Sequence, residues 1–249
     1  MMVKGSGGYT IIEVLLFLAI SGLLLLIAFV GTGSTIRSVR FTDSGRSLEA
    51  FLQKQYDDII NGVNSRTSDL KCSAGNVESG NQAVGTSSCL LIGKLLGFTL
   101  GEGRITINNV VGTEPSGLTY ESLSDKAAIA AFAPVAVTNF NTETYDIPWS
   151  ATVSGTKRLS EPPASINYLL LVRSPKSSRV VSYAFNSPSQ PTDLSAFIQV
   201  PANSGSVTNV CIKNADGFGS PAMLQITPGA TQNAVQVLFD RVQELDCEA

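Results

Sequence analysis

A single carboxylate lies inside the most apolar stretch of the chain. From Tyr9 to Val30 only Thr10, Glu13 and Ser21 are polar. A carboxylate at the centre of a membrane span costs on the order of 3 kcal/mol, and less near an edge, where Glu13 lies one helical turn after Tyr9. If the chain is cut before Tyr9, the new amine of an adjacent copy is a partner for this carboxylate. The simpler alternative is that Glu13 reaches out to the membrane interface.

The cysteines are the other residues with chemistry of their own. The chain of 249 residues has no histidine and four widely spaced cysteines, so neither a zinc site nor a histidine-based catalytic triad is expected. An even number of cysteines is typical of disulfides in an oxidising compartment. Four cysteines allow three connectivities, and the favoured one closes two nearby loops, Cys72 with Cys89 and Cys211 with Cys247.

No sequence pattern indicates an enzyme, a cofactor or a metal ion. The glycines at Gly97–Gly103 and Gly217–Gly219 are typical of turns, because neither group follows a strand and opens a helix. Asn214–Gly217 has part of a calcium-loop pattern but lacks the remaining ligands, so we interpret it as a turn. Asp57 and Asp58 are expected on the solvated face of a helix.

Bulk composition excludes some classes of protein. Hydrophobic residues make up 43% of the chain and charged residues 15%, which excludes a largely disordered protein, and the net charge of -3 gives no overall attraction to nucleic acid. One basic cluster remains, Arg173, Lys176 and Arg179 with Tyr183 close by, which suits DNA phosphates. The alternative is a solvated hairpin turn, which Ser174–Ser178 favours, so DNA as a partner has little support.

The stretch from Tyr9 to Val30 is long enough to cross a membrane as a helix. At 1.5 Å per residue it is roughly 33 Å long. An ordinary secretory signal has a shorter apolar core with a cleavage site after it, and the small residues at Gly31–Ser34 keep such a cut open as an alternative. That interpretation explains neither the Gly7–Gly8 pair before the stretch nor the glutamate inside it.

The residues from Gly8 to Leu16, GYTIIEVLL, resemble the cleavage region of type IV prepilins and type II secretion pseudopilins. That family has a glycine before the cut, an aromatic or hydrophobic first residue after it, and a glutamate fifth. The resemblance implies cleavage between Gly8 and Tyr9 by a prepilin peptidase and N-methylation of Tyr9. It also implies that Glu13 assists filament assembly by facing the N-terminal amine of a neighbouring subunit. Tyr9 stands where the family usually has phenylalanine.

Helical periodicity continues beyond the apolar stretch. Apolar residues recur at spacings of three and four from Leu48 to Val63, and Asn61–Gly62 marks the end of the pattern. The sequence therefore predicts one helix from about Thr10 to about Val63, with a weak point at Gly31 to Gly33. The predicted organisation is a leader at residues 1–8, a long helix at 9–63 with a membrane-spanning first half and an amphipathic second half, and a β-rich head at 64–249. The fold class is α+β, with this helix packed on an antiparallel head.

Short apolar runs separated by glycine, serine, asparagine and proline predict the strands of the head. The stretch Ala127–Ala133 suits either a helix or a strand, and Ser160–Ser165 and Ser187–Pro191 are predicted surface loops. The predicted strands are Cys89–Ile92, Phe98–Leu100, Arg104–Val111, Val135–Phe140, Asn167–Val172, Arg179–Phe185, Ala196–Val200, Val207–Lys213, Met223–Thr227 and Ala234–Asp240.

The resemblance implies a subunit of an extracellular filament. Its partners would be a prepilin peptidase, other pilin subunits, an inner-membrane assembly platform and, before assembly, the lipid of the cytoplasmic membrane. The loop closed by Cys211 and Cys247 is similar to the C-terminal disulfide loop of pilins, and the strand opening at Cys89–Gly93 loosely resembles the H group of minor pseudopilins.

The resemblance implies that major pilins are usually shorter than this chain, and it therefore favours a minor pilin of a pilus that serves adhesion, motility or DNA uptake. Such a subunit is a single-pass membrane protein before assembly, with its C-terminal portion outside, and part of an extracellular filament afterwards. The alternatives are a minor pseudopilin of a type II secretion system and a membrane-anchored surface-binding protein.

Overall fold

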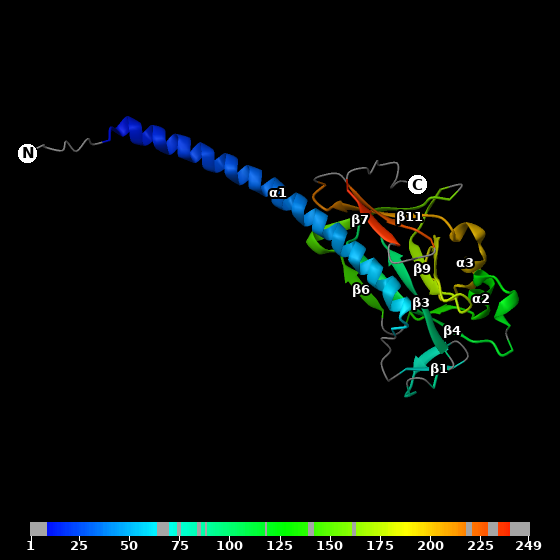
Figure 1. Cartoon of the computed structure of the whole chain (residues 1–249). Helices are drawn as coiled ribbons and strands as arrows, with labels where there is room; N and C mark the ends of the chain where they lie inside the picture. Colours follow the sequence, from blue (N-terminus) through cyan, green and yellow to red (C-terminus); the bar gives the residue numbers. More distant parts are fainter. Residues whose placement is uncertain are drawn as a thin grey trace, which may run out of the picture. The chain divides into compact units, whose positions relative to one another are not determined.

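The structure is a computed structural model that describes residues 9–63, 70–73, 76–83, 86–87, 89–117, 119–138, 142–160, 163–217, 221–228 and 234–239. The fold class is α+β, as the sequence predicts: a long N-terminal helix and a mostly antiparallel β-rich head (Figure 1). The chain divides into two compact units, Met1–Phe41 and Thr42–Ala249. The second half of the helix belongs to the second unit, together with the head.

Helix α1 (Ile11–Ile60) is continuous, and the predicted weak point at Gly31 to Gly33 stays helical. It ends where the sequence indicates, because Gly62 adopts a left-handed conformation with φ of +64°. There the Val63 N–H donates to the Asp58 carbonyl at 2.8 Å and the Gly62 N–H to the Ile59 carbonyl at 3.2 Å. These two bonds form the Schellman motif that satisfies the last carbonyls of a helix.

The larger sheet has six antiparallel strands. Its spatial order is β10 (Val180–Phe185), β9 (Tyr168–Arg173), β3 (Cys89–Phe98), β4 (Arg104–Thr113) and β5 (Val135–Ala136), and β6 (Glu143–Asp146) pairs with another part of β4. Strand β3 places Lys94 against α1, whereas the next residue, Leu95, packs with Ile129 of α2 (Asp125–Ala131) and Ile198 of α3 (Ser195–Gln199). The sheet therefore has helices on both faces, and the α2–α3 face holds the main hydrophobic cluster.

The smaller sheet has five strands in the order β13 (Val235–Leu238), β12 (Ala222–Ile226), β11 (Thr208–Asn214), β7 (Ala151–Arg158) and β8 (Ala164–Ser165). Described residues join it to the larger sheet near both ends of β7. The Gly101 N–H donates to the Val153 carbonyl at 2.8 Å. At the other end of β7, buried Arg158 donates through Nη1 to the Ala184 carbonyl and to Asn203 Oδ1, both at 2.6 Å, and burial lowers the pKa of this guanidinium.

The remaining elements are a small hairpin and three short 3-10 turns. The hairpin pairs β1 (Leu70–Ser73) with β2 (Asn76–Ser79), and the predicted disulfide between Cys72 and Cys89 ties it to β3. Closing a loop over a sequence separation of 17 is worth about 3 kcal/mol in the chain-entropy account. The 3-10 turns are η1 (Tyr120–Ser122), η2 (Pro148–Ser150) and η3 (Pro201–Asn203).

Several predicted strands differ from the structure. The prediction of a strand at Ala196–Val200 is wrong, because Ser195–Gln199 forms α3 and buries Ile198 in the cluster between α3 and the sheet. The predicted strand Cys89–Ile92 is part of β3, which runs on through Gly93 and Gly97 to Phe98. The predicted strand Phe98–Leu100 is wrong beyond its first residue, because Thr99 and Leu100 lie in the turn after β3. The predicted strand Val135–Phe140 is only two residues long in β5, and its last two residues lie outside the described residues.

Other elements had no clear signal in the sequence. Strand β7 was missed, although its burial alternates over much of its length, because two of its buried residues, Thr156 and Arg158, are polar. The ambiguous stretch Ala127–Ala133 is helical as far as Ala131, where α2 ends, and the Ser124 hydroxyl accepts from the Ala127 N–H and caps the N-terminus. The predicted loop Ser160–Ser165 includes β8, a two-residue edge strand.

We expect Gly93→Ala to lower the free energy of unfolding of the head by about 3 kcal/mol, because overpacking forces the backbone to shift. A Cβ at Gly93 would lie 2.1 Å from the Leu171 carbonyl oxygen. The matched control is Gly33→Ala, where nothing lies within 4 Å and the helix gains about 1 kcal/mol. The measurement is thermal unfolding of the full chain in detergent micelles. Equal melting temperatures for Gly93→Ala and wild type would contradict the close approach of β9.

Candidate functional site

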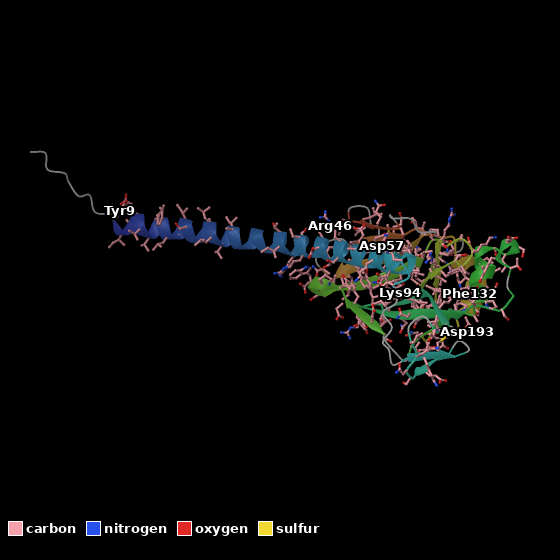
Figure 2. The ribbon with its side chains drawn as sticks, turned by 60° about the horizontal axis from the view of Figure 1, so that its bottom comes forward. Tyr9, Arg46, Asp57, Lys94, Phe132 and Asp193 are labelled. Atoms are coloured by element: carbon pink, nitrogen blue, oxygen red, sulfur yellow. A yellow bond between two sulfur atoms is a disulfide. The ribbon has the colours of Figure 1, made fainter. Side chains whose placement is uncertain are left out.

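The predicted processing and assembly residues lie at the N-terminal end of α1. Gly8 is outside the described residues. Tyr9 is 85% exposed and precedes the first helical residue by two positions, so it lies outside the helix (Figure 2). Glu13 is in the first turn of α1.

Glu13 has a partner within its own chain. Its Oε2 accepts from the Thr10 N–H at 3.0 Å and from the Thr10 hydroxyl at 3.2 Å, while the Glu13 N–H donates to Thr10 Oγ1 at 3.3 Å. This reciprocal arrangement is a capping box, which satisfies N–H groups that have no partner inside the helix. The sequence carries the signal of this capping box, Thr-x-x-Glu before an apolar run. Glu13 therefore caps the N-terminus of α1, in addition to any role in assembly.

The first part of α1 exposes apolar side chains on all sides (Figure 2). Ile11, Phe17 and Leu26 are 80%, 70% and 65% exposed, and the other large apolar residues from Ile12 to Ile27 are exposed as well. This is the one helix in the described part of the chain that is long and apolar enough to cross a membrane, by length and composition. A helix that is apolar all round is stable only when lipid or protein covers it.

Within the second unit, the start of the helical segment is attached to the loop around η2. The Trp149 indole donates to Asp43 Oδ2 at 2.7 Å, and the Ser44 hydroxyl donates to the Pro148 carbonyl at 2.7 Å. Trp149 and Ser150 both have positive φ, 59° and 58°, which is strained for residues with a Cβ. The two bonds to α1 help to hold this strained turn.

Further along, α1 contacts both sheets. Glu49 Oε1 accepts from the Val237 N–H at 3.2 Å and so covers the edge strand of the smaller sheet. Phe51 stacks on Tyr145 of β6 with ring centroids 3.9 Å apart. Burial, and to a smaller extent the Asp43 carboxylate, raises the pKa of Tyr145. A hydrogen bond to the smaller sheet and an aromatic stack on the larger sheet thus both hold α1 on the head.

A buried lysine lies beneath the last turns of α1. Lys94 Nζ donates to Asp58 Oδ2 at 2.9 Å and to Gln55 Oε1 at 2.7 Å, and its side chain is 5% exposed. Asp58 was predicted on a solvated face; this is wrong, since its side chain is 19% exposed and paired, while Asp57 beside it is exposed. The prediction failed because the sequence does not show which strand residue lies opposite. Buried charges need such partners, because desolvation is costly.

Tyr56 is buried between the same helix face and the sheet. Its hydroxyl has no hydrogen bond of ordinary geometry to any described residue, and burial raises its pKa, an effect that the Ser182 hydroxyl only partly offsets. Leu48, Leu52 and Ile59 complete the buried stripe. The predicted stripe was too long, because Ile60 and Val63 are 40% and 49% exposed.

The other candidate residues lie elsewhere in the head. Cys211 is buried and disulfide-bonded, whereas Cys247, its predicted partner, lies outside the described residues. Lys176 is in the β9–β10 turn, as the hairpin alternative predicted, and donates to the carbonyls of Glu121, at 3.3 Å, and Leu123. Tyr183, proposed to lie near that cluster for DNA contact, is 1% exposed in the core and so cannot stack on a base.

Comparisons of the chain with protein-family models, with curated proteins and with solved structures find no match. Among the described residues, no group of three or more histidine, cysteine, aspartate or glutamate side chains is placed to hold a metal ion. The site that the structure brings together is therefore α1 itself, with a capped N-terminus, an exposed apolar first part and a second part packed into the head.

We expect Asp58→Asn to lower the free energy of unfolding by about 3 kcal/mol, because it leaves the Lys94 ammonium buried without a counter-charge. The adjacent and exposed Asp57→Asn should change it by no more than about 0.5 kcal/mol. Denaturant unfolding of the full chain in micelles, followed by the fluorescence of the single tryptophan, measures both. If the two variants are equally stable, the buried pair does not hold the helix on the sheet.

Proposed function

We propose that this chain is a type IV pilin-like subunit, most simply a minor pilin, that is cleaved after Gly8 and assembled into an extracellular filament. The observation that carries the proposal is the exposed apolar first part of one continuous helix whose second part is packed into a β-rich head. The cleavage-type residues Gly8 and Tyr9 and the single carboxylate Glu13 stand at the start of that same helix. A surface-binding protein needs an anchor but does not require this combination.

The mechanism follows from the two environments that cover the helix in turn. Before assembly the exposed apolar surface lies in the cytoplasmic membrane, where lipid covers it. After removal of the leader by a prepilin peptidase, an assembly platform moves the subunit into a bundle in which the helices of other subunits replace the lipid. The head stays outside throughout, and the Cys72–Cys89 disulfide supports this orientation because such bonds persist in oxidising compartments.

Glu13 has two roles in this proposal. Within its own chain it caps the helix through Thr10, as described above. In the filament its charge pairs with the methylated amine of Tyr9 on a neighbouring subunit, since a carboxylate in an apolar bundle needs an opposite charge. Cleavage leaves Thr10 in place, so the cap persists in the mature chain.

We expect the chain co-expressed with a prepilin peptidase to lose its first eight residues and to begin at a methylated Tyr9. The Gly8→Ala variant, which changes the residue before the cut, should keep the leader. Intact mass and N-terminal sequencing of the purified protein distinguish these products. A wild-type chain that keeps its leader, or that begins beyond Gly33, would instead support a membrane-anchored or secreted binding protein.

We expect Glu13→Gln to be processed like wild type but to enter filaments at least about tenfold less well. Glutamine can still complete a capping box, so this change removes the charge and spares the helix start. The complementary Thr10→Val removes the capping hydroxyl, at about 1 kcal/mol, and keeps the charge, so it should assemble within about twofold of wild type. Quantitative blotting of sheared filaments measures both. Normal assembly of Glu13→Gln would limit Glu13 to the capping role.

A further inference from the structure

Strands β3 and β9 separate at one end of the larger sheet. They pair from Gly97 with Tyr168 as far as Gly93 with Val172, and no described residue pairs with β3 on that side before Gly93. The cause is a β-bulge, because Leu91 and Gly93 face consecutive residues of β4 and Ile92 is the extra residue between them. From Arg173 onwards, β9 stays with β10 and enters the turn in which the Ser174 N–H donates to the Arg179 carbonyl at 2.7 Å.

A pocket of about 380 Å³ opens where the two strands separate. Leu90, Leu91 and Ile92 line one side, and the turn from Arg173 to Ser178 lines the other. Phe132 and Tyr120 also line it, as does Glu114, which accepts from the Tyr120 hydroxyl at 2.8 Å. Its volume is at the lower end of the range for ligand sites in proteins.

The pocket contains an unused sheet edge. On the side facing away from β4, the backbone of Leu90, Leu91 and Ile92 has no strand partner in the described part of the chain. An open edge with apolar pockets beside it is what an extended peptide recognises when it adds to a sheet. Three residues of edge are about 10 Å long, which matches a short extended segment.

Charge adds a preference to this edge. Arg173 lines the pocket and forms no ion pair with any described carboxylate. Glu114 also lines it and keeps its negative charge when it accepts from the Tyr120 hydroxyl, so the pocket has one cationic and one anionic group. The Arg173 guanidinium favours an acidic group of the ligand on its side of the pocket.

The pocket is also placed where a partner can reach it. Lys94 lies opposite the last turns of α1, and Leu90 is four residues earlier on β3, roughly 13 Å farther along the strand. The pocket is therefore at the end of the head beyond the C-terminus of α1, away from Thr42, where the helical segment of this unit begins.

We propose that this pocket binds an extended peptide segment carrying an acidic group, which adds as a short strand to the free edge of Leu90–Ile92 beside Arg173. This inference does not depend on the pilin-like function, because it concerns only the head. The peptide belongs to another chain, for example an acidic extended tail of a second protein on the same surface.

The probe is a phage-displayed library of random seven-residue peptides, selected on the full chain in lipid nanodiscs after depletion on empty nanodiscs. We expect enrichment of peptides with an acidic residue. A selected peptide made synthetically should weaken by at least about tenfold on the variants Arg173→Ala and Leu90→Asp, the loss typical of a charge-assisted contact or an apolar anchor. Leu90 is 45% exposed, so its replacement is not expected to disturb folding.

Two variants serve as matched controls. Leu159 is 43% exposed and does not line the pocket, and Arg179 is an exposed arginine of the same turn that does not line it either. Leu159→Asp and Arg179→Ala should bind the peptide within about twofold of wild type. Equal losses on the pocket variants and on these controls would place the peptide elsewhere and overturn the proposal.

N-methylation of the peptide, one residue at a time, tests the strand pairing itself. Because alternate N–H groups of a strand point to the same neighbour, methylation should abolish binding at alternate positions and be tolerated between them. A uniform response would show that side chains alone are recognised and would contradict edge pairing. A selection that enriches no peptide would also overturn the proposal. The same holds if the chain binds neutral glycans on an array and no peptide.

Discussion

The rest of the chain depends on one constraint, which is that the apolar surface of the first part of α1 cannot stay in water. The large apolar side chains from Ile11 to Ile27 are exposed. Burying one such side chain is worth about 1.5–3 kcal/mol, so covering half a dozen of them equals the whole net stability of an ordinary domain, about 5–15 kcal/mol. A lipid bilayer and a bundle of like helices both satisfy this requirement. The rest of the chain therefore needs an interior that does not use that surface.

The head meets this need because its interior is complete without the first unit. The α2–α3 face of the larger sheet has its own cluster, and the other face is covered by the stripe of Leu48, Leu52, Tyr56 and Ile59. Polar contacts then fix how α1 sits on the sheets: Asp43 with Trp149, Glu49 with the edge of β13, and Asp58 with Lys94. Apolar contact alone permits a helix to slide or rotate, whereas these specific pairs allow one register.

The sequence was sufficient to predict the elements whose signals are local. The apolar run, the three-and-four spacing of the stripe and the Asn61–Gly62 stop predict both ends of α1 to within three residues, and the nearness of Cys72 to Cys89 gives their disulfide. Local sequence patterns did not predict the secondary structure of segments whose conformation depends on packing against distant parts of the chain. The segment that forms α3 has apolar residues that suit a strand, and its helical form is selected by the cluster around Ile198.

The same limit applies to the candidate sites. The capping box of Thr10 and Glu13 was visible in the sequence, but the partner of Asp58 was not, because Lys94 is 36 residues away on a strand whose register is set by the sheet. The pocket beside Arg173 depends on a bulge at Ile92, which no local pattern announces. The sequence does contain the glycine that the bulge needs. Gly93 follows the extra residue, and a Cβ at this position would clash with the Leu171 carbonyl.

In the proposed function, the exposed part of α1 is covered by lipid before cleavage and by other subunits afterwards. The most direct measurement is to shear surface filaments from cells that express the chain, with and without the prepilin peptidase, and to locate the chain by immunoblotting. We expect the shortened chain in the filament fraction only when the peptidase is present, and the full-length chain in the membrane fraction when it is absent. A chain that stays in the membrane fraction under both conditions would contradict it.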